Sequence, residues 1–270
     1  MLKITALRAF SDNYIWLLQR EGRSEVVVVD PGQSEMVIEH LDKHELKLVA
    51  ILITHQHYDH TGGVQALLAL YPDIPVIGPD RDCSEVKLDI DLLIPEFITY
   101  AVAEGDMVFL PQLGLNFDVI STPGHTLDHL AFVGEGIAFC GDTLFGAGCG
   151  RIFSGTAQMF SASLSKLAAL PADTRLYCAH EYTVDNLGFA KRAEPNNHSI
   201  IERGEAALKK QQEGQPTIPT TVALELATNP FMRLQQPEVK QAAENYAGKT
   251  LDEDWQVFAA LREWKDTKYD

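Results

Sequence analysis

An almost unbroken apolar run, LVAILIT at residues 48–54, is the feature that most restricts how this 270-residue chain can fold. A strand with one solvent-exposed face alternates apolar and polar residues, whereas a continuous apolar strand is buried on both faces. Helical patterns lie on either side of the run, one with Met36, Ile38 and Leu41 and one that stops at Pro72. Short strands alternating with helices in this way predict an α/β sandwich.

The second feature is a change of character near residue 180. Strand patterns continue to residues 175–179, and from residue 181 four helical segments follow, punctuated by Gly and Pro: VDNLGFAKRAE, SIIERGEAALKKQQEG, PEVKQAAENYAG and DEDWQVFAALREWKD. We therefore predict an α/β domain at residues 1–180 and a smaller helical domain at residues 181–270.

Composition excludes several classes of protein. A formal net charge of −16 disfavours nucleic acid as a partner, because phosphate binding needs a basic stripe. No window approaches the roughly 20 apolar residues of a membrane span, and the N-terminus lacks a signal-peptide pattern, so a cytoplasmic protein without a membrane partner is expected. The four cysteines are scattered without a CxxC pair, which disfavours a zinc ribbon or a disulfide framework: Cys83, Cys140, Cys149 and Cys178.

The apolar run ends in THQHYDH, which concentrates His55, His57, Asp59 and His60 within six residues. Alternate side chains at this spacing can converge, so the segment can serve two metal ions, one through His55 and His57 and the other through Asp59 and His60. Imidazole and carboxylate suit zinc, iron or manganese. A polar loop without any ligand is the alternative, which is less expected at the carboxyl end of a strand.

Three more strand ends repeat the theme. His125 follows a Pro-Gly turn, Asp142 follows a glycine, and His180 ends the pattern LYCAH. Any one of these residues alone would more often be an ordinary loop residue than a ligand. Seven candidate ligands at four strand ends indicate a metal centre.

The motifs THQHYDHTGG, TPGHT, GDTLFGAGCGR and CAHEYT resemble those of the metallo-β-lactamase superfamily, and GCGR with HEYT is most similar to the glyoxalase II, or hydroxyacylglutathione hydrolase, family. The resemblance runs from DNYIWLL and VVVDPG to NPFMR and the last helix. It implies a four-layer αββα sandwich followed by a smaller α-helical domain. It also implies two divalent metal ions, with zinc expected and iron or manganese as alternatives: one held by His55, His57 and His125, one by Asp59, His60 and His180, with Asp142 bridging them.

The resemblance implies the chemistry as well. A water activated by the two ions would attack a thioester carbonyl, and Asp59 would orient the resulting hydroxide and accept its proton. No GxSxG motif or Ser-His-Asp pattern supports a covalent route. Glutathione would be held in a helical substrate-binding domain and at its border by Arg151, Phe153, Tyr182, Arg262 and Lys265. Arg262 and Lys265 share a helix face, and solvation of that face is the alternative role for both.

The function expected from the resemblance is hydrolysis of S-D-lactoylglutathione to glutathione and D-lactate, the second step of methylglyoxal detoxification, by a monomeric enzyme. A persulfide dioxygenase with one iron, or a lactonase, is the rival enzyme on the same fold. A metal-binding protein without catalysis is the rival from another class, although such proteins typically lose ligands. A β-lactamase fits poorly without an export signal.

Three further features of the sequence lie outside these motifs. Asp30, after the strand VVVV, is expected mainly to form a turn, with support of a ligand histidine as the alternative. His129 is expected to be structural. The segment at residues 79–106 is longer than the resemblance suggests, and its effect on the site cannot be derived from the sequence.

Overall fold

The computed structural model describes residues 1–80 and 96–269. Cys83 and most of the long segment at residues 79–106 lie outside the described residues. The chain divides into two compact units. The first unit comprises Met1–Ser121 and Leu127–Gly141, and the second comprises Thr122–Thr126 and Asp142–Asp270. The predicted domain boundary at residue 180 falls inside the second unit and stays a prediction.

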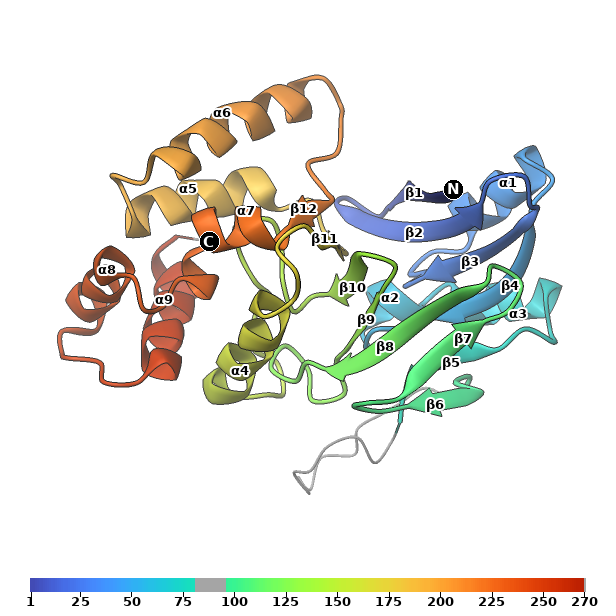
Figure 1. Cartoon of the computed structure of the whole chain (residues 1–270), viewed down its shortest axis with the longest axis horizontal. Helices are drawn as coiled ribbons and strands as arrows, with labels where there is room; N and C mark the ends of the chain where they lie inside the picture. Colours follow the sequence, from blue (N-terminus) through green and yellow to red (C-terminus); the bar gives the residue numbers. More distant parts are fainter. Residues whose placement is uncertain (81–95, 270) are drawn as a thin grey trace. The chain divides into compact units, whose positions relative to one another are not determined.

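A mixed six-stranded sheet forms one layer of the first unit, in the order β1-β2-β3-β4-β5-β6 (Figure 1). Its strands β1 to β3 are antiparallel, and β3 to β6 are parallel. The bounds are β1 Leu2–Ala9, β2 Asn13–Arg20, β3 Glu25–Val29, β4 Lys47–Leu52, β5 Val76–Pro79 and β6 Tyr100–Val102. The parallel strands bring the carboxyl ends of β3 and β4 to the same edge, where the loops with Asp30 and the histidine cluster begin.

Strand β4 confirms the prediction from its apolar run, since every residue except Lys47 is buried. On one face, Leu48 and Ile51 join a core with Val37 of α1 (Glu35–Lys43) and Leu67 of α3 (Val64–Leu70). Removing such side chains from water is the main source of stability for this layer. The short helix α2 (Tyr58–Thr61) precedes α3 and carries part of the histidine cluster.

Helix α1 contains the predicted helical pattern of Met36, Ile38 and Leu41. The helix ends at Lys43, because Glu45 adopts a positive φ of 53° and the amide of Leu46 donates to the carbonyl of Leu41. Ser34 occupies the N-cap position, but its side chain makes no capping hydrogen bond.

Four antiparallel strands form the other sheet layer of the first unit, in the order β10-β9-β8-β7. They are β7 Met107–Leu110, β8 Leu115–Ser121, β9 Leu130–Gly134 and β10 Ile137–Gly141. Leu115, Phe117 and Val119 of β8 are buried while Asn116 and Asp118 between them are exposed, as expected for a strand with one covered face.

The second unit is mainly helical and has an aromatic core. The rings of Phe160 and Phe231 each pack against Phe258, at centroid distances of 5.3 and 5.6 Å. Phe189 stacks on Phe231 at 5.9 Å. The elements are α4 Ala157–Ala168, β11 Arg175–Cys178, α5 Thr183–Ala193, α6 His198–Gln212, β12 Thr220–Thr221, α7 Val222–Thr228, a 3-10 turn at Pro230–Met232, α8 Pro237–Ala247 and α9 Asp254–Lys268.

Candidate metal centre

Four of the seven predicted ligands belong to the loop after β4 in the first unit, and glycines let this loop pack against the turn after β3. A Cβ atom added to Gly32 would lie 1.8 Å from the carbonyl oxygen of Asp59, and one added to Gly63 would lie 2.6 Å from that of Pro31. The amide of Gly63 donates to the same Pro31 carbonyl at 2.8 Å. Only glycine permits so close an approach of the two backbones, which explains why positions 32 and 63 are glycine.

The turn after β3 supplies a buried carboxylate to this loop. Asp30 accepts hydrogen bonds from the amide and the hydroxyl of Thr54, at 2.8 and 2.7 Å. Its Oδ2 also accepts from Nδ1 of His60 at 3.0 Å. Asp30 has a φ of 52°, so it makes the turn as expected, and it also supports a candidate ligand. The contacts of Asp30 thus agree with both the expected turn and the alternative, support of a candidate ligand histidine.

Asp30 reaches a second histidine through Thr54. Because the Thr54 hydroxyl donates to Asp30, its oxygen is available to accept from Nδ1 of His55, which lies 3.1 Å away. The Nε2 atoms of His55 and His60 then carry the lone pairs with which a neutral imidazole binds a metal ion. One buried carboxylate thereby sets the tautomer of two predicted ligands.

Asp59 and His55 have supporting contacts that the sequence did not predict. The amide group of Asn13, the first residue of β2, donates to Oδ2 of Asp59 at 3.0 Å. The ring of His129 stacks on that of His55, with centroids 4.6 Å apart and 21° between the planes. Asn13 stands in the motif DNYIWLL, which is the one signal that could have drawn attention to it.

The other three predicted ligands belong to the second unit, where a loop that begins at Asp142 folds back on His125. Nδ1 of His125 donates to the carbonyl oxygen of Arg151 at 2.7 Å, which leaves the lone pair on Nε2. The amide of Gly150 donates to the carbonyl of Asp142 at 3.1 Å. A Cβ atom on Gly150 would lie 2.3 Å from that carbonyl oxygen, so the loop requires glycine there.

The Asp142 carboxylate lies between two imidazoles. Its Oδ2 is 3.3 Å from Nε2 of His125, and its Oδ1 is 3.4 Å from Nε2 of His180. All three side chains are buried. One oxygen turned toward each histidine is the arrangement expected of a carboxylate that bridges two ions.

The candidate ligands of each unit suit a bound cation. In the second unit, the lone pair of His125 Nε2 faces a carboxylate oxygen at 3.3 Å, and in the first unit His60 Nε2 faces Oδ2 of Asp59 at 3.5 Å. Two acceptors at such distances repel unless a positive charge lies between them. Each of the seven predicted ligands offers a nitrogen or carboxylate oxygen that could hold an ion.

Comparison with known proteins decides the family. The model of the metallo-β-lactamase superfamily matches residues 9–180, and that of the hydroxyacylglutathione hydrolase C-terminus matches residues 181–268. A hydroxyacylglutathione hydrolase of Alkalilimnicola ehrlichii is 49% identical, over 98% of this chain and 99% of that protein. One of Nitrosomonas europaea is 43% identical, over 98% and 96%. The chain belongs to the hydroxyacylglutathione hydrolase family.

Membership in this family confirms the predicted resemblance and the metallo-β-lactamase fold. Among solved structures, the B3 metallo-β-lactamase BLEG-1 is similar in fold, with a TM-score of 0.62 and 22% identity over 86% of this chain and all of that chain. The superfamily and the His and Asp side chains together indicate a divalent-metal protein. Within the described residues, no helix has both the length and the apolarity that crossing a bilayer requires.

Two of the five predicted glutathione contacts in this family member are aromatic side chains beside metal-ligand candidates. Tyr182 stacks on the ring of His180, with centroids 4.9 Å apart and 8° between the planes. Phe153 meets the ring of His125 edge-on at 5.1 Å and is 66% exposed. Both side chains thus offer accessible surface next to candidate ligands.

The three predicted basic contacts differ in burial. The Arg151 side chain is 58% exposed, and its Nε lies 3.5 Å from Asp266. Arg262 is buried and donates to the same carboxylate at 2.9 Å and to the carbonyl of Cys149 at 3.1 Å. Lys265 is also buried, 3.4 Å from Asp185. Both Arg262 and Lys265 contact carboxylate or carbonyl groups within the second unit. Their predicted contacts with the substrate stay predictions.

Cys149, which lies in the loop between Asp142 and Arg151, is expected to be unreactive. Burial raises the pKa of its thiol from the ordinary value of 9.0 to about 11, although the Arg262 charge opposes the shift. This difference makes the thiolate fraction at pH 8 roughly a hundredfold smaller. Burial of the neutral thiol stabilises the folded state below pH 9, and that contribution is lost as the pH rises toward 11.

We therefore expect iodoacetamide at pH 8 to label the Cys149 peptide of the native protein at least about a hundredfold more slowly than that of the urea-unfolded protein. Peptide mass spectrometry measures both rates. Rapid labelling of the native protein would contradict the burial of this thiol and would reopen a covalent route.

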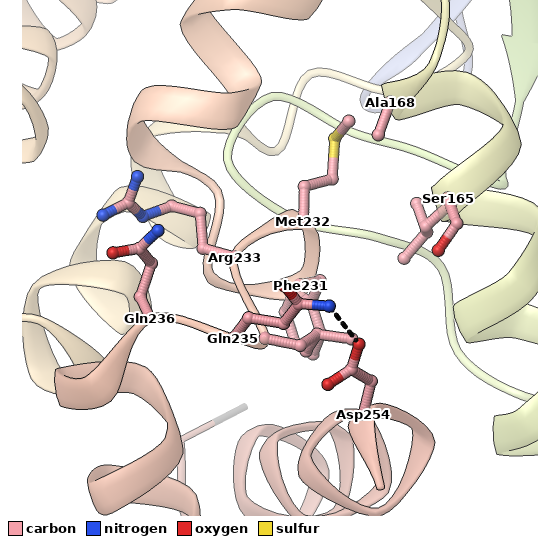
Figure 2. A pocket seen from close by; sticks show the side chains of 10 residues that line it. Ser165, Ala168, Phe231, Met232, Arg233, Gln235, Gln236 and Asp254 are labelled. Atoms are coloured by element: carbon pink, nitrogen blue, oxygen red, sulfur yellow. Dashed lines mark hydrogen bonds between the residues drawn. The ribbon is translucent and has the colours of Figure 1, made fainter.

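The second unit also contains a pocket that none of the predicted site residues lines (Figure 2). It is lined by parts of α4 and by residues 231–236 and Asp254, none of which is a predicted ligand or substrate contact. Arg233 is held by both carboxylate oxygens of Glu194 at 2.8 Å, and Gln235 donates to Asp254 at 2.9 Å. The charged groups that line this pocket, Arg233 and Asp254, are thus hydrogen-bonded to other side chains of the protein.

Proposed function

We propose that this protein is a binuclear metal-dependent thioester hydrolase that splits S-(2-hydroxyacyl)glutathione, with S-D-lactoylglutathione as the expected substrate, into glutathione and D-lactate. The observation that supports this function most is the similarity, over nearly the full length, to proteins named hydroxyacylglutathione hydrolase. The retention of all seven candidate ligands argues against a protein that has lost catalysis.

Two divalent ions are the proposed cofactors, and zinc is the metal expected. His55, His57 and His125 would hold one ion, and Asp59, His60 and His180 the other, with Asp142 shared. The support lies in the donor chemistry of each unit: Asp30 and the Arg151 carbonyl take the Nδ1 protons of His60 and His125, and each Nε2 lone pair then faces a carboxylate. Imidazole and carboxylate accept zinc, iron and manganese alike.

When bound, the two ions would lower the pKa of a shared water and supply hydroxide near neutral pH. Asp59 is the proposed proton acceptor and orienting group for that hydroxide. Its Oδ2 is held by Asn13, which fixes the carboxylate without neutralising it. The thiolate of glutathione leaves with little need for protonation, so no further acid is required.

Glutathione is proposed to contact Arg151, Phe153, Tyr182, Arg262 and Lys265. Arg151 offers an exposed guanidinium for a carboxylate, and the two aromatic rings offer surface beside His125 and His180. No macromolecular partner is proposed. A monomer located in the cytoplasm is the expected form of the enzyme.

The function is tested by supplying S-D-lactoylglutathione to the metal-loaded protein and following the loss of thioester absorbance. A parallel sample receives glutathione persulfide in an oxygen electrode, and a third receives a lactone. Thioester loss with equimolar release of D-lactate, and no oxygen uptake, is the expected result. Oxygen uptake with persulfide, or turnover of the lactone alone, would instead assign the site to one of the rival enzymes.

A further inference from the structure

The loop that joins Asp142 to Arg151 is held at four consecutive residues by side chains from the later helices of the second unit. Asn186 of α5 donates to the carbonyl of Gly146 at 3.1 Å. The amide of Ala147 donates to Glu225 of α7 at 2.9 Å. Asn229 donates to the carbonyl of Gly148 at 2.9 Å, and Arg262 of α9 donates to that of Cys149 at 3.1 Å. We call these four side chains the loop clamp: Asn186, Glu225, Asn229 and Arg262.

All members of the loop clamp are buried, and two of them, Glu225 and Asn229, are hydrogen-bonded to each other. Asn229 donates to Oε2 of Glu225 at 2.9 Å, and Arg203 pairs with Oε1 of the same carboxylate at 2.6 Å. Burying a carboxylate costs free energy that its hydrogen bonds must offset. Apolar side chains would fill the same space without this cost, so the network indicates a role beyond packing. It engages a loop that is closed within itself by the two backbone hydrogen bonds between Phe145 and Gly148, both at 3.0 Å.

The loop needs such support because its centre is strained. Ala147 adopts a φ of 56°, a conformation that costs a residue with a side chain roughly 1 kcal/mol or more. Strain of this kind persists only where the surroundings impose it. The Glu225 carboxylate receives the amide of this same residue, which ties the strained conformation to the clamp.

Both ends of the loop carry groups of the candidate metal centre. Asp142 begins it, between His125 and His180, and the Arg151 carbonyl that ends it accepts from Nδ1 of His125. Gly150 ties the two ends together through its bond to the Asp142 carbonyl. A shift at the centre of the loop would therefore move the bridging carboxylate and release the histidine tautomer.

We propose that the loop clamp is a set of positioning residues for the metal centre, through which α5, α7 and α9 fix Asp142 and the Arg151 carbonyl. In this role Arg262 acts on the loop backbone. The inference rests on the proposed function for its consequence in catalysis, but its effect on metal retention is independent of the substrate. The proposal also assigns a structural role to Asn229, the first residue of the motif NPFMR.

The test compares Asn229→Ala and Asn186→Ala with the unmodified protein, each as the full zinc-loaded chain. The concentration of a zinc chelator that strips half of the metal is measured, together with kcat for S-D-lactoylglutathione and the melting temperature. Groups that orient metal ligands typically contribute 10- to 100-fold to affinity or activity. We expect the half-stripping concentration to fall by about tenfold in each variant, and kcat with it.

Asn197→Ala is the matched control, because this asparagine also donates to a backbone carbonyl, that of Ala227, and caps α6 without touching the loop. It should lower the melting temperature and leave the stripping curve unchanged. Stripping curves of Asn229→Ala and Asn186→Ala that match the unmodified protein would overturn the clamp, whatever happens to stability. If all proteins retain zinc but none hydrolyses the thioester, the proposed function fails while the stripping curves still decide the clamp.

Discussion

Replacing Asp142 by alanine should abolish both metal retention and thioester hydrolysis. The reason is the position of its carboxylate, with one oxygen 3.3 Å from Nε2 of His125 and the other 3.4 Å from Nε2 of His180. In the proposed bridging role, this carboxylate would neutralise charge on two ions at once, so its loss should cost at least about 4 kcal/mol of transition-state stabilisation, or roughly a thousandfold in rate. Elemental analysis and the thioester assay measure the two effects.

Two comparison variants make this result interpretable. Asp142→Asn keeps the shape of the side chain but removes its charge, so it should lose nearly as much activity as the alanine variant. Asp252→Ala removes one exposed carboxylate elsewhere in the second unit and should retain full metal content and turnover. Full turnover in folded Asp142→Ala protein would show that the assignment of this ligand is wrong.

Replacing Asp30 by asparagine should lower metal affinity and kcat/KM by about 10- to 100-fold. One oxygen of this carboxylate accepts from both Thr54 and His60, and Thr54 in turn lies 3.1 Å from Nδ1 of His55. An amide group in that position would lose the acceptor for one donor or present its own donor to another. Asparagine tolerates the positive φ of residue 30, so the turn itself should survive.

The Asp30→Asn variant is best compared with Asp118→Asn, which removes the same charge from the exposed face of β8. Chelator titration and the thioester assay should separate the two proteins clearly, and only Asp30→Asn should also lower the melting temperature, because it alone disturbs buried hydrogen bonds. Equal metal affinity in both variants would mean that Asp30 does no more than form the turn after β3.

The sequence predicted the fold where burial and periodicity agree. The continuous apolar run of β4 predicted a buried strand, and all its residues except Lys47 are buried. In β8, buried apolar residues alternate with exposed polar ones from Leu115 to Val119, as the sequence indicates. Family and fold were predicted from the four motifs and are confirmed. The seven ligands and the five glutathione contacts stay predictions.

Helix α7 could not be predicted, because its pattern is inverted. Leu224 and Leu226 are each 38% exposed, while the charged Glu225 between them is fully buried. Its burial depends on partners distant in the sequence, Arg203 of α6 and the amide of Ala147. Hydrophobic periodicity carries no information about such a pair, so neither the helix nor the loop clamp follows from the sequence alone.

Among the supporting residues of the first unit, Asn13 was not predicted and Asp30 was predicted only as the less favoured alternative, for a similar reason. Asn13 lies 46 residues before Asp59, and Asp30 lies 30 residues before His60. A lone Asn or Asp after a strand is adequately explained as a turn residue. Only the packing of the turn after β3 against the histidine loop, which Gly32 and Gly63 permit, brings these side chains to the ligands.

The most direct test of the central claim is a zinc titration of the chelator-treated protein, with S-D-lactoylglutathione hydrolysis followed at each addition. Two ions held in one centre predict that activity reaches its plateau at about two zinc ions per chain, and that Asp142→Ala never reaches it. A plateau at one ion per chain, or full activity in protein verified to hold no metal, would contradict the binuclear mechanism.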